Sequence, residues 1–163
     1  MLISEKMQTR LNEQINQEQY SAQLYLAMAA AFEKMGLKVF AQLYYNHTNE
    51  ETAHAMKVLK YVVDVGGKVE LKAVDAPRTK YDSVADIVQA TVDHELKVTE
   101  AINDLVAVAE KEKDYAARSF LSWFVDEQVE EVASAQELVQ LVKMTPPQMI
   151  LALESRIAKM IEG

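Results

Sequence analysis

Two short motifs place possible metal ligands on one face of a helix. Glu51 and His54 are three residues apart in "NEETAHAM" and form an E-x-x-H motif. Gln128 and Glu131 have the same spacing in "FVDEQVEEV". Side chains three residues apart on an α-helix project from the same face. Oxygen donors with one imidazole suit iron or manganese better than metals that prefer sulfur. The two motifs therefore indicate candidate metal ligands.

Two further acids, Glu18 and Glu95, interrupt apolar patterns in the same way. These patterns repeat in alternating steps of three and four residues, which is typical of amphipathic helices. Glu18, Glu51, Glu95 and Gln128 each lie within about three residues of the middle of a predicted helix, so helices packed side by side bring them to one level. Buried carboxylates are costly unless they are compensated, so this grouping predicts a bound cation.

The predicted helices are few and long. Apolar patterns and capping residues predict helices near residues 4–35, 37–65, 83–112, 114–143 and 146–161. Ser83 and Asp114 are the expected N-caps of the third and fourth helices. The 163 residues include only four Gly and three Pro, too few for a fold with many turns, so we predict an all-α fold.

The lengths of the connections predict how the helices are arranged. A few residues join the first helix to the second and the third to the fourth, which predicts two antiparallel hairpins. About 16 residues join the second to the third, and they can span roughly 50 Å when extended. One long crossover is typical of ferritin-like four-helix bundles. We expect a single domain over residues 1–163, with the bundle at about 4–143.

A short amphipathic helix is predicted after the bundle, near residues 146–161. Thr145 is its expected N-cap, Pro146 a first-turn proline and Gln148 a capping-box residue. Because the bundle is complete without this helix, we expect its apolar face to be buried between subunits. The face consists of Met149, Ile150, Leu153, Ile157 and Met160.

Charge and composition exclude several classes of protein. The net charge is −8 and there is no basic tail, which disfavours nucleic acid and anionic membranes as partners. The absence of Cys excludes disulfide scaffolds, zinc ribbons, thiol nucleophiles and cysteine-held iron–sulfur clusters. No apolar stretch is long enough to span a membrane, and the N-terminal segment lacks the apolar core of a signal peptide. The expected location is cytoplasmic.

Four segments together resemble the helices of non-haem bacterial and archaeal ferritins. They are "LNEQINQEQYSAQLYLAM", "NEETAHAMKVL", "DHELKVTEAINDL" and "FLSWFVDEQVEEV", and the resemblance covers about residues 4–143. It implies a ferroxidase, which oxidises Fe(II) with O₂ or hydrogen peroxide at a di-iron centre inside each subunit. It also implies a homo-oligomer, a 24-mer cage, in which ferric mineral is stored.

The resemblance assigns roles to the candidate ligands. It implies that Glu18, Glu51 and His54 hold a first iron, and that Glu51 bridges to a second iron. Glu95 and Glu131 would hold the second iron.

The resemblance extends to further residues, with two departures. Tyr25 matches a tyrosine that can supply an electron. By the same resemblance, Gln128 lies beside the second iron. Di-iron oxygenases, bacterioferritins and rubrerythrins have the Glu of a second E-x-x-H motif at this position. Because this chain lacks that motif, we expect the second iron to exchange readily. Thr52 replaces the methionine that binds haem in bacterioferritins, so no haem is expected. The acids that match a third iron position are Glu50, Glu127 and Glu130.

Alternative functions stay open. A di-iron oxidase or peroxidase that stores no iron would use the same ligands, although the missing second E-x-x-H motif weighs against it. A non-enzymatic helical scaffold is a second alternative. A smaller DNA-protecting relative of ferritin is a third, but its metal site lies between subunits and the negative charge disfavours DNA.

Several residues have simpler interpretations. Gln128 is alternatively a hydrogen-bonding core amide, Tyr25 a core tyrosine, and the acids of the third position solvated surface groups. His47 interrupts an apolar pattern and is interpreted as a bundle histidine with its hydrogen bonds satisfied. His94 is expected to face solvent, and Trp123 to serve packing.

Overall fold

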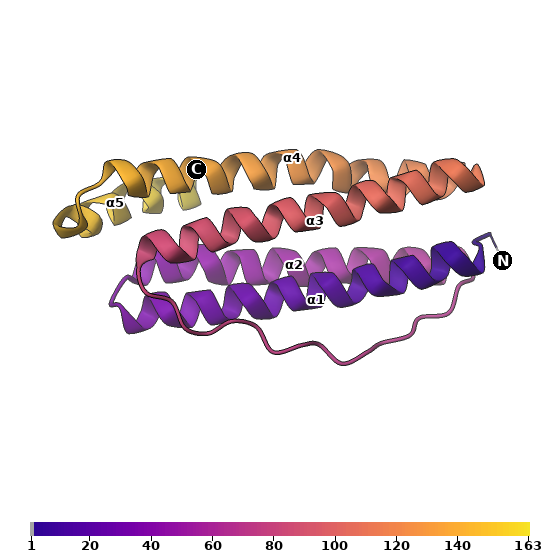
Figure 1. Cartoon of the computed structure of the whole chain (residues 1–163), viewed down its shortest axis with the longest axis horizontal. Coiled ribbons are helices and arrows are strands. Elements are labelled where there is room, and N and C mark those ends of the chain that lie inside the picture. The colour runs from indigo at the N-terminus through magenta and orange to yellow at the C-terminus, as the bar shows by residue number, and fades with distance from the viewer. Residues whose placement is uncertain (1) are drawn as a thin grey trace.

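The protein is a bundle of four long helices with a short fifth helix, as the sequence predicts (Figure 1). A computed structural model describes residues 2–163, and no strand occurs among them. The helices are α1 (Glu5–Lys34), α2 (Lys38–Asp64), α3 (Val84–Glu112), α4 (Tyr115–Met144) and α5 (Ile150–Glu162), with a 3₁₀ turn, η1 (Pro147–Met149), before α5.

Side-chain caps fix where three of the long helices begin. The Ser4 hydroxyl accepts a hydrogen bond from the Met7 backbone N–H at 3.0 Å and starts α1. Ser83 and Asp114 cap α3 and α4 in the same way, at 3.1 and 2.9 Å, which confirms both predicted caps. Each cap satisfies a backbone donor that has no partner within its own helix.

The start of the last helix differs from the prediction. Thr145 was expected to cap it, but the Thr145 hydroxyl donates to the Leu141 carbonyl at 2.7 Å and so belongs to the end of α4. Pro146 and Pro147 have no backbone N–H, and a tight turn closes there with the Met149 N–H donating to the Pro146 carbonyl at 2.8 Å. The α-helical part therefore starts at Ile150, four residues later than predicted.

The long helices pack as two antiparallel hairpins, α1 with α2 and α3 with α4, and α1 also contacts α3. The crossover between α2 and α3 runs along the outside of α1 to the opposite end of the bundle (Figure 1). Amide side chains of α1 hold it there. The Asn12 amide donates to the Lys68 carbonyl at 2.9 Å and accepts from the Glu70 N–H at 2.8 Å, and Gln8 and Asn16 make similar bonds.

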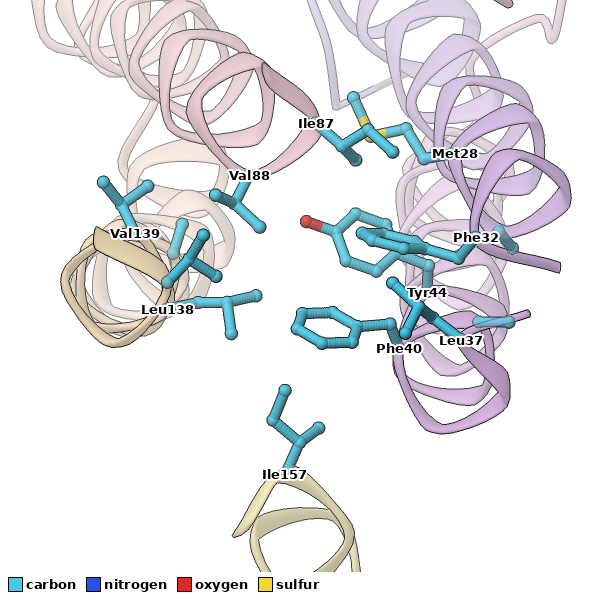
Figure 2. Packing of buried hydrophobic residues seen from close by; sticks show 14 of the residues in the cluster. Met28, Phe32, Leu37, Phe40, Tyr44, Ile87, Val88, Leu138, Val139 and Ile157 are labelled. Atoms are coloured by element: carbon cyan, nitrogen blue, oxygen red, sulfur yellow. The ribbon is translucent and has the colours of Figure 1, made fainter. Parts of the chain in front are cut away.

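The core has two apolar parts separated by a polar layer. One part, near α5, packs aromatic rings such as Phe32, Phe40 and Tyr44 (Figure 2). The other, at the far end, includes Met7 and Leu121. In every long helix, the acidic or amide residues that interrupt the apolar pattern lie between the two apolar parts. These polar residues therefore lie together at the centre of the bundle.

The fifth helix packs against its own chain. Leu153 and Ile157 are buried in the core part near α2 and α4, so the expectation that subunit contacts bury this face is wrong for these two residues. Met149 and Met160 stay exposed within the chain, and burial between subunits stays a prediction for them. In the part of the chain that the structure describes, no helix has both the length and the apolar character of a membrane span.

Candidate metal centre

Glu18, Glu51 and His54 converge in the polar layer at the middle of the bundle. All three are buried, and one potential ligand atom from each lies within 4.8 Å of the others. His54 Nδ1 is 3.4 Å from Glu51 Oε2 and 3.7 Å from Glu18 Oε2. The E-x-x-H motif thus meets an acid from the neighbouring helix α1, as the shared level predicts.

A second group lies beside the first and shares Glu51 with it. Glu51, Glu95 and Glu131 also bring one oxygen each within 4.8 Å of one another. Glu95 is buried and Glu131 half-buried. Because Glu51 belongs to both groups, a carboxylate lies between two positions where a cation could bind.

The two oxygens of the Glu18 carboxylate differ in their hydrogen bonds. Glu18 Oε1 accepts a hydrogen bond from the Gln14 amide at 2.7 Å. Glu18 Oε2 is buried and has no hydrogen-bond partner among the described residues. A buried carboxylate oxygen without a partner is costly. A metal ion would satisfy it.

Gln128 enters the site through its amide nitrogen. Nε2 donates to Glu95 Oε2 at 3.1 Å, to the Glu95 carbonyl at 3.2 Å and to the Thr99 hydroxyl at 3.1 Å. The amide thus orients the Glu95 carboxylate from the α4 side. A glutamate at this position would be an acceptor only and would repel Glu95.

Tyr25 contacts the other oxygen of the Glu95 carboxylate. Its phenol donates a hydrogen bond to Glu95 Oε1 and is buried. The ring is surrounded by those of Tyr44, His47 and His94, with centroids 5.9, 5.5 and 5.8 Å away. Burial and the neighbouring Glu95 hold the pKa of Tyr25 well above its usual value, so the phenol stays protonated.

Burial governs the protonation of the acids. Desolvation and the neighbouring carboxylates raise the pKa of Glu51 to about 9, and desolvation raises that of Glu131 to about 7 and that of Glu95 above its usual value. Burial lowers the pKa of His54, but the nearby carboxylates of Glu18 and Glu51, 3.7 and 3.4 Å from its Nδ1, outweigh it and raise this pKa to about 10. Without a metal, protons and an imidazolium therefore balance the buried negative charge.

The three acids that resemble a third iron position are not placed alike. Glu127 Oε1 is 3.9 Å from His54 Nε2, and Glu127 also groups with Glu131. Glu50 Oε2 is 3.2 Å from His47 Nδ1. Glu130 is exposed and belongs to none of the groups that could hold a metal among the described residues. Two of the three acids thus adjoin the site.

The structure adds two residues to the site that sequence reasoning did not place there. His47 groups with Glu50 and Glu131, with one ligand atom of each within 4.8 Å. His47 precedes Glu51 by four residues, and this spacing, which is visible in the sequence, places both side chains on one helical face. Gln14 lies four residues before Glu18, which is the corresponding signal on α1.

The structure differs from the prediction for one of two aromatic residues near the site, His94 and Trp123. His94, which was expected to face solvent, is half-buried: its Nε2 is 2.7 Å from the Ser21 hydroxyl of α1, and burial lowers its pKa to about 4. Trp123 packs as expected. Its ring meets the His54 ring edge-on at 5.3 Å, and Lys57 Nζ lies 3.5 Å from its centroid.

Known proteins resemble this chain in sequence and in fold. A ferritin-like domain matches residues 8–145. A bacterial non-heme ferritin of Bacteroides fragilis (strain 638R) is 35% identical over 158 residues, which are 97% of this chain and 99% of that protein. One of Staphylococcus aureus (strain MRSA252) is 37% identical over 132 residues, or 81% of this chain and 80% of that protein. Among solved structures, a novel open pore ferritin from the hyperthermophilic archaeon Archaeoglobus fulgidus is 42% identical with a TM-score of 0.93, over 96% of each chain.

Proposed function

This chain belongs to the ferritin family, and from that premise we propose that it stores iron and oxidises Fe(II) at the metal centre described above. The observation that carries the proposal is the buried Glu18, Glu51 and His54 group, in which Glu18 Oε2 has no hydrogen-bond partner among the described residues. This group and the adjoining Glu95 and Glu131 would bind two Fe(II) ions as substrate.

The proposed reaction is a redox reaction of the bound iron. Two Fe(II) ions each give up one electron, and O₂ takes both electrons and two protons and leaves as hydrogen peroxide. The carboxylates neutralise the charge that grows as Fe(II) becomes Fe(III). Glu51 would bridge the two ions, since it belongs to both groups.

Two residues tune this reaction in the proposal. Tyr25 would give a further electron to the oxidant, and its phenol proton would pass to Glu95, whose Oε1 already accepts its hydrogen bond. Gln128 holds Glu95 by hydrogen bonds and offers no imidazole to the second ion, so the product would leave readily. Fe(III) would then pass the acids of the third position, which are Glu50, Glu127 and Glu130.

Storage requires an enclosed space, and we propose that copies of this chain form a homo-oligomeric cage, a 24-mer as the sequence resemblance implies. Each subunit would be a single domain over residues 1–163. The cytoplasmic location stays a prediction.

Aerobic iron loading tests this proposal. Purified metal-free protein receives a large excess of Fe(II), and iron is then measured across a size-exclusion profile. Many iron atoms per chain in one large, soluble particle are the expected result. A small oligomer with about two irons per chain, one at each proposed position, would instead indicate a di-iron oxidase without storage. Iron that precipitates as fast as in a protein-free control would contradict both functions.

A further inference from the structure

A cavity of about 70 Å³ adjoins the candidate metal centre on the side of α5. Its inner wall includes Tyr25, Glu95 and Glu131, which are residues of the site. Its outer wall reaches Ser134 and Met160, which are both exposed. The cavity therefore leads from the proposed second metal position to the subunit surface next to α5.

Apolar side chains form most of the outer wall. They come from three helices and include Leu43 of α2, Ala135 and Leu138 of α4 and Ile157 of α5. Polar residues such as His47 and Thr91 also line the cavity, but along the apolar outer wall a hydrated Fe(II) ion would lose water and find few ligands, which is costly. Small neutral molecules such as xenon, in contrast, do bind in apolar protein cavities. The wall thus favours a small neutral molecule over iron.

The fifth helix forms part of the outer wall of this cavity and is held in place by a specific contact. Ile157 points from α5 into the space between Leu138 and Phe40 and is buried (Figure 2). Glu154 anchors the helix, because its Oε1 accepts hydrogen bonds from the N–H groups of Val39 and Phe40 at 3.1 and 3.3 Å. The position of α5 therefore determines the shape of the outer part of the cavity.

We propose that this cavity is the binding site and access route for dioxygen, and that it delivers O₂ to the Glu95 and Glu131 side of the metal centre. The inference rests on the proposed function, in which O₂ oxidises Fe(II) there.

Xenon tests the cavity itself without iron. It is an apolar atom that reports on space accessible to O₂, and it is applied under pressure to crystals of the metal-free protein. We expect xenon in the cavity of the wild type and none in Ala135→Leu, where a larger side chain fills the space. Ala133→Leu is the matched control, since Ala133 is exposed on the same helix and does not line the cavity. No xenon in the wild-type cavity would overturn the proposal.

Kinetics then test the route. With O₂ at low concentration, we expect Ala135→Leu to slow Fe(II) oxidation about ten-fold, while Ala133→Leu behaves as the wild type and anaerobic Fe(II) binding is the same in all three. Met160→Ala shortens an exposed side chain at the outer end and is expected to fold normally and to react at least as fast as the wild type. Wild-type rates in a folded Ala135→Leu protein, or slower oxidation in Met160→Ala, would overturn the inference.

These results separate the inference from the function on which it rests. If the wild type does not oxidise Fe(II) at all, the proposed function fails, whatever xenon shows. If the wild type oxidises Fe(II) and filling the cavity has no effect on the rate, only the route for O₂ fails.

Discussion

Protons take the place of metal ions at the centre of the bundle. Glu51, Glu131 and His54 all have pKa values above the ordinary ones, at about 9, 7 and 10. Burial disfavours the charged forms of the two acids, whereas the neighbouring carboxylates stabilise the imidazolium of His54. A metal binds the deprotonated side chains, so metal and protons compete for the same sites. The acidity of the site and its affinity for iron are therefore two aspects of one arrangement.

The first prediction concerns stability and pH. Between about pH 7 and pH 9 the folded metal-free protein holds more protons at Glu51 and His54 than the unfolded chain does, so its stability falls as the pH rises. The lowered pKa of His94 acts only below about its ordinary value of 6.5 and does not oppose this trend. With Zn(II) bound, the trend should flatten or reverse, because protons no longer occupy the ligands. Thermal unfolding with and without Zn(II) across this range measures both; a metal-free protein that gains stability with pH would contradict the prediction.

The second prediction concerns Gln128. In Gln128→Glu, Glu95 loses its hydrogen-bond donor and gains a like charge, so the metal-free protein should lose about 1–3 kcal/mol of stability. The added carboxylate should in turn strengthen binding at the second metal position. Chemical denaturation and anaerobic Zn(II) titration give the two quantities.

Gln136→Glu is the matched control, because Gln136 is an exposed residue of the same helix. Stronger destabilisation by the control than by Gln128→Glu, or weaker metal binding in Gln128→Glu, would show that the amide does not act through Glu95.

At the scale of the helices, a side chain of α5 caps the N-terminus of α2 and so attaches α5 to the bundle. The residue before α2, Leu37, has no side chain that can cap it, and Glu154 of α5 accepts from two of its first backbone N–H groups. A carboxylate at a helix N-terminus also interacts favourably with the helix dipole. The start of α2 and the position of α5 therefore depend on the same side chain.

The third prediction follows from this cap. Glu154→Ala should lower stability by about 1 kcal/mol and speed amide hydrogen exchange at Val39 and Phe40. The matched control is Glu162→Ala, since Glu162 is an exposed acid at the other end of α5. Hydrogen exchange followed by mass spectrometry or NMR measures the effect, and equal exchange in both variants would show that Glu154 does not hold α5 in solution.

Local patterns predicted most of the fold, and contacts between distant segments account for the errors. The long helices, the crossover and the level of Glu18, Glu51, Glu95 and Gln128 follow from helical periodicity and connection length. The place of α5 depends on a contact between residues 115 positions apart, which periodicity does not report. His94 was misjudged for the same reason, because the Ser21 hydroxyl that it meets is 73 residues away.

At the scale of the whole molecule, oxidation and storage should separate. Every candidate ligand in the two central groups comes from one chain, so we expect a single subunit to hold the whole proposed site. Storage, in contrast, needs a closed space that no single bundle offers. The subunit still exposes large apolar side chains, among them Leu71, Met144 and Leu151, which assembly could cover.

The last prediction tests this separation by comparing assembled and dissociated protein from one preparation, separated by size. Both fractions should bind about two Zn(II) ions per chain and oxidise a first small addition of Fe(II) at similar rates, because the ligands are the same. Only the assembled fraction should keep a large excess of iron in solution, because mineral that forms outside an enclosure can grow and precipitate. A dissociated subunit that binds no metal while remaining helical by circular dichroism would mean that assembly completes the site, and the single-chain metal centre would then be wrong.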